Sequence, residues 1–119
     1  MTEGAGPVLV VDDDPAIREA VRDALEAIGV RVDTAEDGAD ALAKVIQEEP
    51  CMVLLDMRMP VMDGWGFAHA VQERGMELRV VVMTAAADAR RWAREIGAIG
   101  VVPKPFALSE LVAAVAPCN

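Results

Sequence analysis

The chain has 119 residues, a hydrophobic share of 54% and a formal net charge of −9. This length suits one domain, and the apolar share is enough to bury one core. The negative charge repels nucleic acid phosphates and anionic membranes, so direct binding to either is not expected. No apolar run approaches the roughly 20 residues of a membrane span. Because residues 1–6 also have no signal-peptide pattern, we expect a cytoplasmic protein.

Strand and helix patterns alternate five times along the chain. Strands are predicted from apolar runs at residues 8–11, 30–32, 52–55, 78–83 and 99–102, and helices from amphipathic stretches at residues 15–28, 42–46, 67–71, 89–96 and 108–115. Asp14 is well placed to cap the first helix, whereas Asp37-Gly38 indicates a turn. Such alternation predicts an α/β fold, a doubly wound parallel sheet with helices on both faces.

Polar side chains follow four of the predicted strands. Asp12 and Asp13 end the first strand, Asp56 the third and Thr84 the fourth, and Lys104 follows the fifth. Because the carboxyl ends of parallel strands line one crevice, we expect these five side chains to meet there.

This combination of groups is suited to a divalent cation and to phosphoryl chemistry. Three carboxylates in one crevice repel one another, so without a counterion at least one would have a raised pKa. Carboxylates are the oxygen ligands that Mg2+ prefers. Asp56 is the best nucleophile candidate, since a carboxylate can attack phosphorus to give an acyl phosphate.

Histidine and cysteine chemistry is not expected in this chain. His69 is the only histidine, which argues against a zinc site and against a Ser-His-acid triad. Cys51 and Cys118 are the only cysteines. We interpret both as free thiols in a reducing compartment, without a disulfide.

The sequence resembles the receiver domain of bacterial two-component response regulators, in a stand-alone, CheY-like form, over essentially its whole length. The matching segments are VLVVDDDP at residues 8–15, LLDMRMPVMDG at 54–64, Thr84-Ala85, and Lys104-Pro105-Phe106. The resemblance implies a five-stranded parallel sheet in the order 2-1-3-4-5 and a cis peptide between Lys104 and Pro105. A flexible leader at residues 1–6 would precede a receiver domain at 7–117, with no output domain.

The resemblance also implies roles for the residues at the metal. Asp56 would be the phosphoacceptor and would also contact Mg2+, or Mn2+ in its place. Asp13 would bind the metal directly, and Asp12 mainly through water. The backbone carbonyl of Arg58 would be the third protein ligand.

The same resemblance implies a signalling function rather than that of an enzyme. A histidine kinase or a histidine phosphotransfer protein would pass phosphoryl to Asp56, while Thr84 and Lys104 hold its oxygens. Phosphorylation and dephosphorylation would be self-catalysed. The product would switch a surface for an unknown downstream protein or relay the phosphoryl group, and the chain would be a monomer or a weak dimer.

One position departs from the receiver pattern. Receiver domains commonly carry Tyr or Phe three residues before the lysine, but here that position is Val101. We therefore expect no aromatic switch on the last strand. We interpret Trp65 and Trp92 as packing residues.

Two alternative functions remain open from the sequence. One is a binding module with a receiver fold that works without phosphorylation, which the missing aromatic allows. The other is a phosphatase of the haloacid-dehalogenase type, because Asp12 and Asp14 match the two-residue spacing of its acids. Against the phosphatase, the chain has no cap domain, and Asp56 stands where that scheme expects Ser or Thr.

Overall fold

The computed structural model describes residues 6–118, so the expected leader, apart from Gly6, lies outside the described residues. The strands are β1 (Val8–Val11), β2 (Val32–Ala35), β3 (Met52–Asp56), β4 (Val80–Thr84) and β5 (Gly100–Pro103). The helices are α1 (Pro15–Ala27), α2 (Gly38–Gln47), α3 (Gly64–Glu73), α4 (Ala89–Ile96) and α5 (Leu108–Val115), followed by the short 3-10 helix η1 (Ala116–Cys118).

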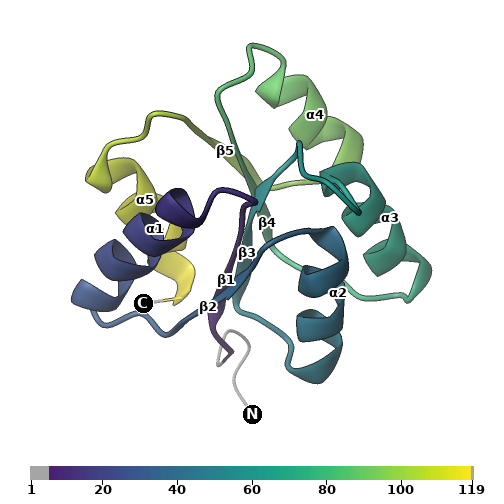
Figure 1. Ribbon diagram of the computed structural model, residues 1–119, viewed down its shortest axis with the longest axis horizontal. Coiled ribbons are helices and arrows are strands. Elements are labelled where there is room, and N and C mark those ends of the chain that lie inside the picture. The colour runs from purple at the N-terminus through teal and green to yellow at the C-terminus, as the bar shows by residue number, and fades with distance from the viewer. Residues whose placement is uncertain (1–5, 119) are drawn as a thin grey trace.

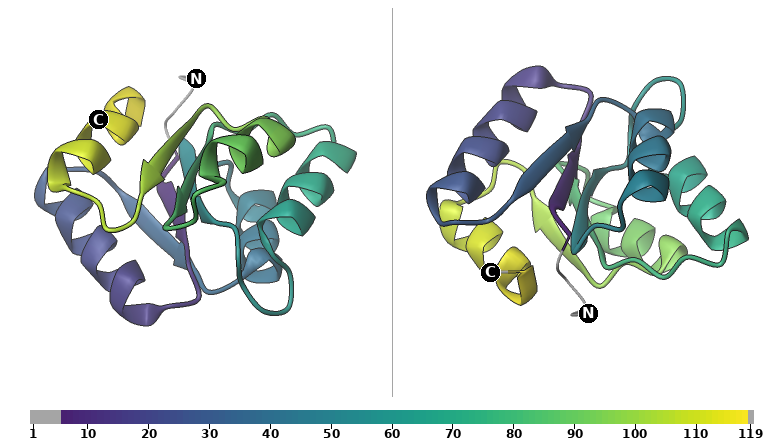
Figure 2. Two further views of the ribbon diagram at one scale, coloured as in Figure 1. Left: turned by 90° about the horizontal axis from the view of Figure 1, so that it is seen from above. Right: turned by 90° about the horizontal axis from the view of Figure 1, so that it is seen from below.

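Across residues 6–118 the strands form one five-stranded parallel sheet in the order β2-β1-β3-β4-β5 (Figure 1). Helices α1 and α5 cover one face, and α2, α3 and α4 cover the other (Figure 2). The predicted fold class, the strand order and the cis peptide between Lys104 and Pro105 are confirmed. The central strand β3 lies between β1 and β4 and is buried along its whole length.

Two apolar layers sandwich the sheet because successive strand residues point to opposite faces. Leu9, Val53 and Val82 pack with Phe67 of α3 on the α2-α3-α4 face. Their neighbours along the strands, among them Val10, Leu54 and Val81, pack against α1 and α5. Burial on both faces explains why β1, β3 and β4 read as continuous apolar runs.

Three aspartates cap helices that begin at the carboxyl edge of the sheet. Asp14 accepts a hydrogen bond from the Ala16 amide, and Asp63 accepts one from the Gly66 amide. The chain bends at Asp37, where a turn was predicted, and Asp37 also caps α2 by accepting from the Asp40 amide. Each carboxylate satisfies an otherwise unpaired amide of a first helical turn.

The two cysteines form a disulfide, so the prediction of free thiols was wrong. Their Cα atoms are 5.9 Å apart although 67 positions separate them in sequence. The reason is topological: η1 carries Cys118 from the end of α5 back to the start of β3, where Cys51 precedes the strand. This edge of the sheet is opposite to the edge that carries the acids.

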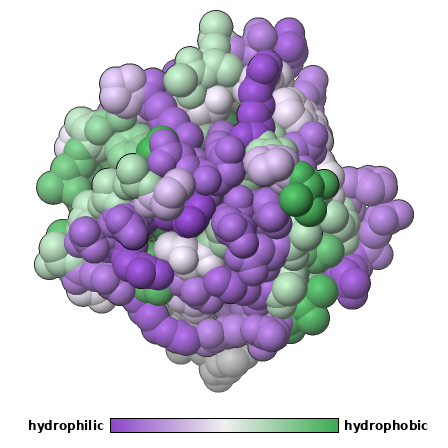
Figure 3. All heavy atoms as spheres, in the orientation of Figure 1, coloured by the Kyte–Doolittle hydropathy of each residue, from purple (hydrophilic) through white to green (hydrophobic). Residues whose placement is uncertain are grey.

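The surface of the molecule is mainly hydrophilic on the face seen in Figure 3, with scattered apolar side chains. Within residues 6–118, the exposed large apolar side chains are scattered: Ile46 is on α2, Leu108 on α5, and Val61 and Ile99 in loops. Among residues 6–118, no helix has the length and apolar character needed to cross a membrane.

Candidate functional site

The structure brings the predicted site residues together at the carboxyl edge of the sheet. The register aligns Val11 with Leu55, and Asp56 with Met83, so β1, β3 and β4 end at the same level. Among the described residues, Asp12, Asp13 and Asp56 offer carboxylate oxygens that all lie within 4.8 Å of one another. The predicted convergence of the acids is confirmed.

The acids differ in their exposure to solvent. Asp12 retains 1% of its accessible surface and Asp56 retains 7%, whereas Asp13 is exposed. Thr84, at the end of β4, retains 6%. The cluster therefore has a buried floor and one acid at its open side.

Lys104 reaches this cluster from the segment that follows β5. Its Nζ lies 2.6 Å from Oδ2 of Asp12 and 3.8 Å from Oδ2 of Asp56. Its backbone amide also donates to the Thr84 carbonyl at 3.0 Å, which anchors the segment to β4. The expectation that Lys104 meets the acids is confirmed, with Asp12 as its nearest partner.

Asp12 is held by further hydrogen bonds. Its Oδ1 accepts from the amide of Asp14 at 2.9 Å, and its Oδ2 accepts from Lys104. Arg18 on α1 donates to the backbone carbonyl of Asp12 at 2.6 Å. Sequence reasoning missed Arg18, because nothing in a helix-face pattern separates it from an ordinary exposed arginine. Both carboxylate oxygens of Asp12 therefore already accept hydrogen bonds.

Asp56 titrates abnormally in this setting. Burial is the main cause and raises the pKa of its carboxyl from 3.8 to about 6, against the opposing effect of the Lys104 charge. The neighbouring charges of Asp12 and Asp13 raise this pKa further, while the backbone of Arg58 lowers it through a hydrogen bond. The raised pKa that the sequence predicted is confirmed, but desolvation contributes more to it than repulsion between the acids.

Thr84 makes a local contact at the end of β4. Its hydroxyl oxygen accepts a hydrogen bond from the amide of Ala86 at 3.2 Å. The hydroxyl proton therefore remains available to another acceptor. Val101 on β5 is partly buried and packs against the α2-α3-α4 layer.

The donor set suits a hard divalent cation. Mg2+ binds carboxylate and carbonyl oxygens and keeps several waters, which the exposed position of Asp13 would allow. Two acids are buried beside a single lysine, so the cluster keeps an excess of negative charge. By contrast, His69 lies on the exposed surface of α3, 3.5 Å from Glu73 and away from the acids.

Comparisons with known proteins agree with this geometry. The family model described as "Response regulator receiver domain" matches residues 8–116. The response regulator MprA of Mycolicibacterium vanbaalenii is 40% identical over 108 residues, which cover 89% of this chain and 47% of MprA. The chain thus spans about half the length of the curated relatives that it matches.

Solved structures show the same fold. The chemotaxis protein CheY4 of Vibrio cholerae has a TM-score of 0.85 at 30% identity, covering 96% of this chain and 98% of that one. The response regulator TrrA of Thermotoga maritima, solved in complex with Mg2+ and BeF, has a TM-score of 0.84 at 32% identity, covering 96% and 99%. The match across residues 8–116, together with the acids and the lysine at the sheet edge, shows that this chain belongs to the response regulator receiver domain family.

Proposed function

We propose that this chain accepts a phosphoryl group on Asp56 from a histidine kinase or a histidine phosphotransfer protein, in a step that requires Mg2+ or Mn2+. The modified chain then switches its surface for a downstream protein or relays the phosphoryl group. The observation that carries this proposal is the position of Asp56, a nearly buried carboxylate at the end of the central strand between Asp13 and Lys104.

The chemistry is a nucleophilic substitution at phosphorus. With a pKa of about 6, the Asp56 carboxylate is mostly ionised at neutral pH. One of its oxygens attacks phosphorus and forms an acyl phosphate. The bond from phosphorus to the donor nitrogen, or to the donor oxygen of a small acyl phosphate, breaks, and the leaving group keeps the electron pair.

The residues at the sheet edge divide the remaining tasks. Asp13, Asp56 and the carbonyl of Arg58 would hold the cation, which when bound neutralises charge that develops on the phosphoryl oxygens. Asp12 would act through water, because both of its oxygens already accept hydrogen bonds. This division follows the exposure of Asp13 and the burial of Asp12.

Lys104 and Thr84 are placed to bind the transferred group. Nζ of Lys104 lies 3.8 Å from Asp56, so the added oxygens would come within reach of its charge. The Thr84 hydroxyl would donate its free proton to the same group. Both contacts exist only after modification, so they shift the equilibrium between two arrangements of the loops after β3 and β4.

We infer that the chain is a signalling protein rather than an enzyme, that it acts as a monomer or a weak dimer in the cytoplasm, and that it binds neither nucleic acid nor membrane directly. The net charge of −9 supports the absence of binding to polyanions. The disulfide weighs against a reducing compartment, although Cys51 is 3% exposed and thereby shielded from reductants.

The test is labelling by acetyl phosphate with Mg2+, read by intact mass. Wild type should gain one phosphoryl group, and Asp56→Asn should gain none. Asp63→Asn is the matched control, because this acid lies at the end of the loop that follows Asp56 and caps α3. Chelation of the metal should abolish labelling. Equal labelling of wild type and Asp56→Asn would overturn the assignment.

One alternative keeps a specific observation in its favour. Val101 stands where relatives carry an aromatic switch, which would suit a module that binds its partner without phosphorylation. Mg2+ binding without phosphoryl uptake from any donor would support that alternative. The phosphatase alternative is disfavoured, because Asp14 is exposed and its carboxylate caps α1.

A further inference from the structure

A cluster of side chains next to the site has no part in the function proposed above. The guanidinium carbon of Arg58 lies 5.1 Å from the ring centroid of Trp92. Trp92 meets Trp65 edge to face, with the ring centroids 5.0 Å apart and the planes at 70°. The indole nitrogen of Trp65 donates to Glu95 at 3.0 Å. We call Arg58, Trp65, Trp92 and Glu95 the tryptophan cluster.

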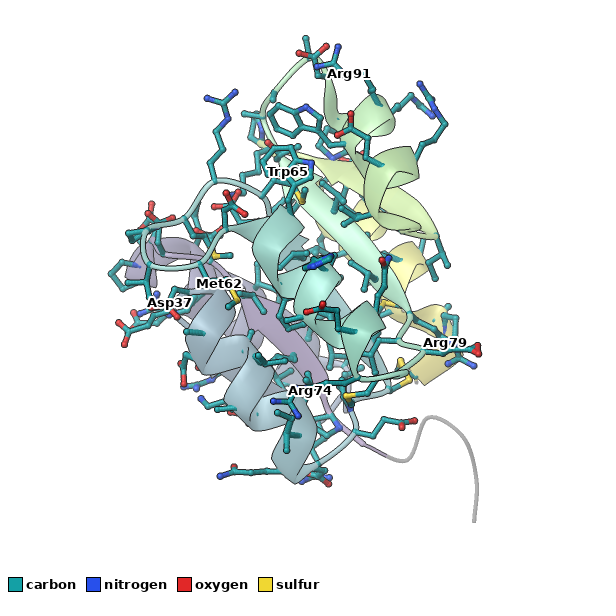
Figure 4. The ribbon with its side chains drawn as sticks, turned by 90° about the vertical axis from the view of Figure 1, so that its right-hand side faces the viewer. Asp37, Met62, Trp65, Arg74, Arg79 and Arg91 are labelled. Atoms are coloured by element: carbon teal, nitrogen blue, oxygen red, sulfur yellow. A yellow bond between two sulfur atoms is a disulfide. The ribbon has the colours of Figure 1, made fainter. Side chains whose placement is uncertain are left out.

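The tryptophan cluster connects the phosphoacceptor loop, residues 57–63, to two helices. Arg58 lies two positions after Asp56, Trp65 is in the first turn of α3, and Trp92 and Glu95 belong to α4. Figure 4 shows Trp65 at the end of α3 that lies beside α4, with Arg74 at the opposite end of α3. The contact between Arg58 and Trp92 therefore spans the loop after β3 and the helix after β4.

The two side chains in this contact differ in their exposure to solvent. Trp92 retains 4% of its accessible surface and is part of the core, whereas Arg58 is exposed. A rearrangement would therefore move the arginine and leave the indole in place. Within residues 6–118, the start of α4 lacks a side-chain cap, since Asp88 makes no capping hydrogen bond. Core packing of Trp92, Ala93 and Ile96 holds the helix, and the contact with Arg58 links its buried face to the loop after β3.

We propose that Arg58 is a positioning residue that couples modification of Asp56 to α4: a phosphoryl group on Asp56 draws the guanidinium away from Trp92 and releases α4 from the phosphoacceptor loop. This inference rests on the proposed function. A guanidinium can form two charge-assisted hydrogen bonds with a phosphate group, whereas it makes a single cation–π contact with the buried indole of Trp92. Lys104 would neutralise only part of the charge on the phosphoryl group, because Asp12 shares this lysine at 2.6 Å. The remaining charge, two residues from Arg58, provides the guanidinium with a partner.

Coupling through Arg58 would provide a way to transmit the signal in a chain that has Val101 in place of an aromatic residue on β5. Val101 cannot act as an aromatic switch, so movement of Thr84 has no aromatic ring on β5 to reorient. The tryptophan cluster joins α4 to α3, which precedes α4 in the sequence, whereas β5 follows α4. It therefore provides a link between the modified loop and α4 that does not pass through β5.

The experiment uses Trp92 as its own reporter. Since the chain has two tryptophans, Trp65→Phe leaves Trp92 as the single indole. Mg2+ with beryllofluoride should change the fluorescence emission of Trp92, because the Arg58 guanidinium leaves the face of the indole ring. Adding Arg58→Gln should make the resting emission resemble the activated state and abolish the further change. Arg58→Lys should restore part of the response.

Controls separate this proposal from the proposed function. Arg74→Gln removes the same charge at the far end of α3 and should keep the full response, and Asp56→Asn should give none. Phosphoryl uptake is measured by mass on each variant, and the indole N–H resonance of Trp92 is followed in wild type. Normal uptake with an unchanged Trp92 signal, or an equal response in Arg58→Gln, would overturn the coupling alone. Absence of uptake in wild type would overturn both proposals.

Discussion

Nζ of Lys104 lies 2.6 Å from the carboxylate of Asp12 but 3.8 Å from that of Asp56, so in the resting protein the lysine is the counterion of Asp12. Lys104→Met would leave Asp12, at 1% exposure, without its charged partner. Because the lysine side chain is 17% exposed, we expect a loss of about 1–3 kcal/mol in the free energy of unfolding, below the range for a fully buried pair. Mg2+ should restore part of it.

Urea denaturation with and without Mg2+ measures this effect. Lys44→Met is the matched control, since Lys44 is the only other lysine and pairs with the more exposed acids Asp33 and Asp40 at 3.6 and 3.9 Å. Its ion pairs should contribute less than about 1 kcal/mol, without dependence on Mg2+. Identical losses in the two variants would contradict the pairing of Lys104 with Asp12.

The second prediction concerns pH. The pKa of Asp56 is raised to about 6 in the folded chain and is near 3.8 when the chain is unfolded. Ionisation of the Asp56 carboxyl is therefore less favourable in the folded state than in the unfolded state. Metal-free wild type should therefore lose stability as pH rises from about 4 to 6, by up to about 3 kcal/mol at 1.36 kcal/mol per pKa unit. Asp56→Asn does not titrate, so its stability relative to wild type should increase over this window and stay constant above it.

Denaturant titrations at several pH values in the presence of a chelator provide the measurement. Other titrating groups are shared by the two proteins and cancel in the difference. A difference that stays flat between pH 4 and 7 would contradict the raised pKa. Added Mg2+ should reduce the difference at neutral pH, because it supplies the charge that the ionised Asp56 lacks.

Metal binding should stabilise the folded chain. A ligand at about 100 times its Kd adds about 2.7 kcal/mol when only the native state binds it. We expect a saturable rise of Tm with Mg2+ in wild type and a weaker one in Asp13→Asn, because Asp13 is the exposed acid at the site. Asp14→Asn is the control, since Asp14 caps α1 and should leave the Mg2+ response unchanged. Equal responses of both variants would remove Asp13 from the ligand set.

Gly64 should be intolerant of any side chain. A Cβ at this position would lie 2.5 Å from Sδ and 2.9 Å from Cα of Met57, the residue after Asp56. Gly64→Ala should therefore shift the phosphoacceptor loop, reduce phosphoryl uptake and destabilise the fold by about 1–3 kcal/mol, as overpacking usually does. Gly100→Ala, where a Cβ would meet nothing within 4 Å, should change neither property. Uptake rates and urea midpoints test both.

The disulfide provides a prediction about stability under reducing conditions. Cross-links of this kind typically add about 2–4 kcal/mol by restricting the unfolded chain. Cys118→Ser should therefore lower Tm under oxidising conditions and match wild type in excess reductant. Thiol alkylation followed by mass analysis counts the free cysteines. Two alkylated thiols in untreated wild type would contradict the bond.

The sheet and the acid cluster were predictable because each rests on a local pattern. An apolar run followed by Asp56 or Thr84 specifies a buried strand and the group at its end, and parallel pairing brings these ends together. The disulfide was not predictable, since the approach of Cys118 to Cys51 depends on where α5 ends in space. The contact of Arg58 with Trp92 was also out of reach, because helix periodicity does not say which loop side chain will cover an indole.

Val61 at the tip of the phosphoacceptor loop has a φ of 70° and is 85% exposed. A β-branched residue in this left-handed region carries a penalty of about 1–2 kcal/mol, and little surrounding packing compensates for it. The resting conformation of the loop is therefore strained at Val61. Any alternative conformation that returns Val61 to negative φ is favoured by release of this backbone penalty. Glycine at this position would adopt the positive φ without that penalty and would therefore stabilise the resting conformation of the loop.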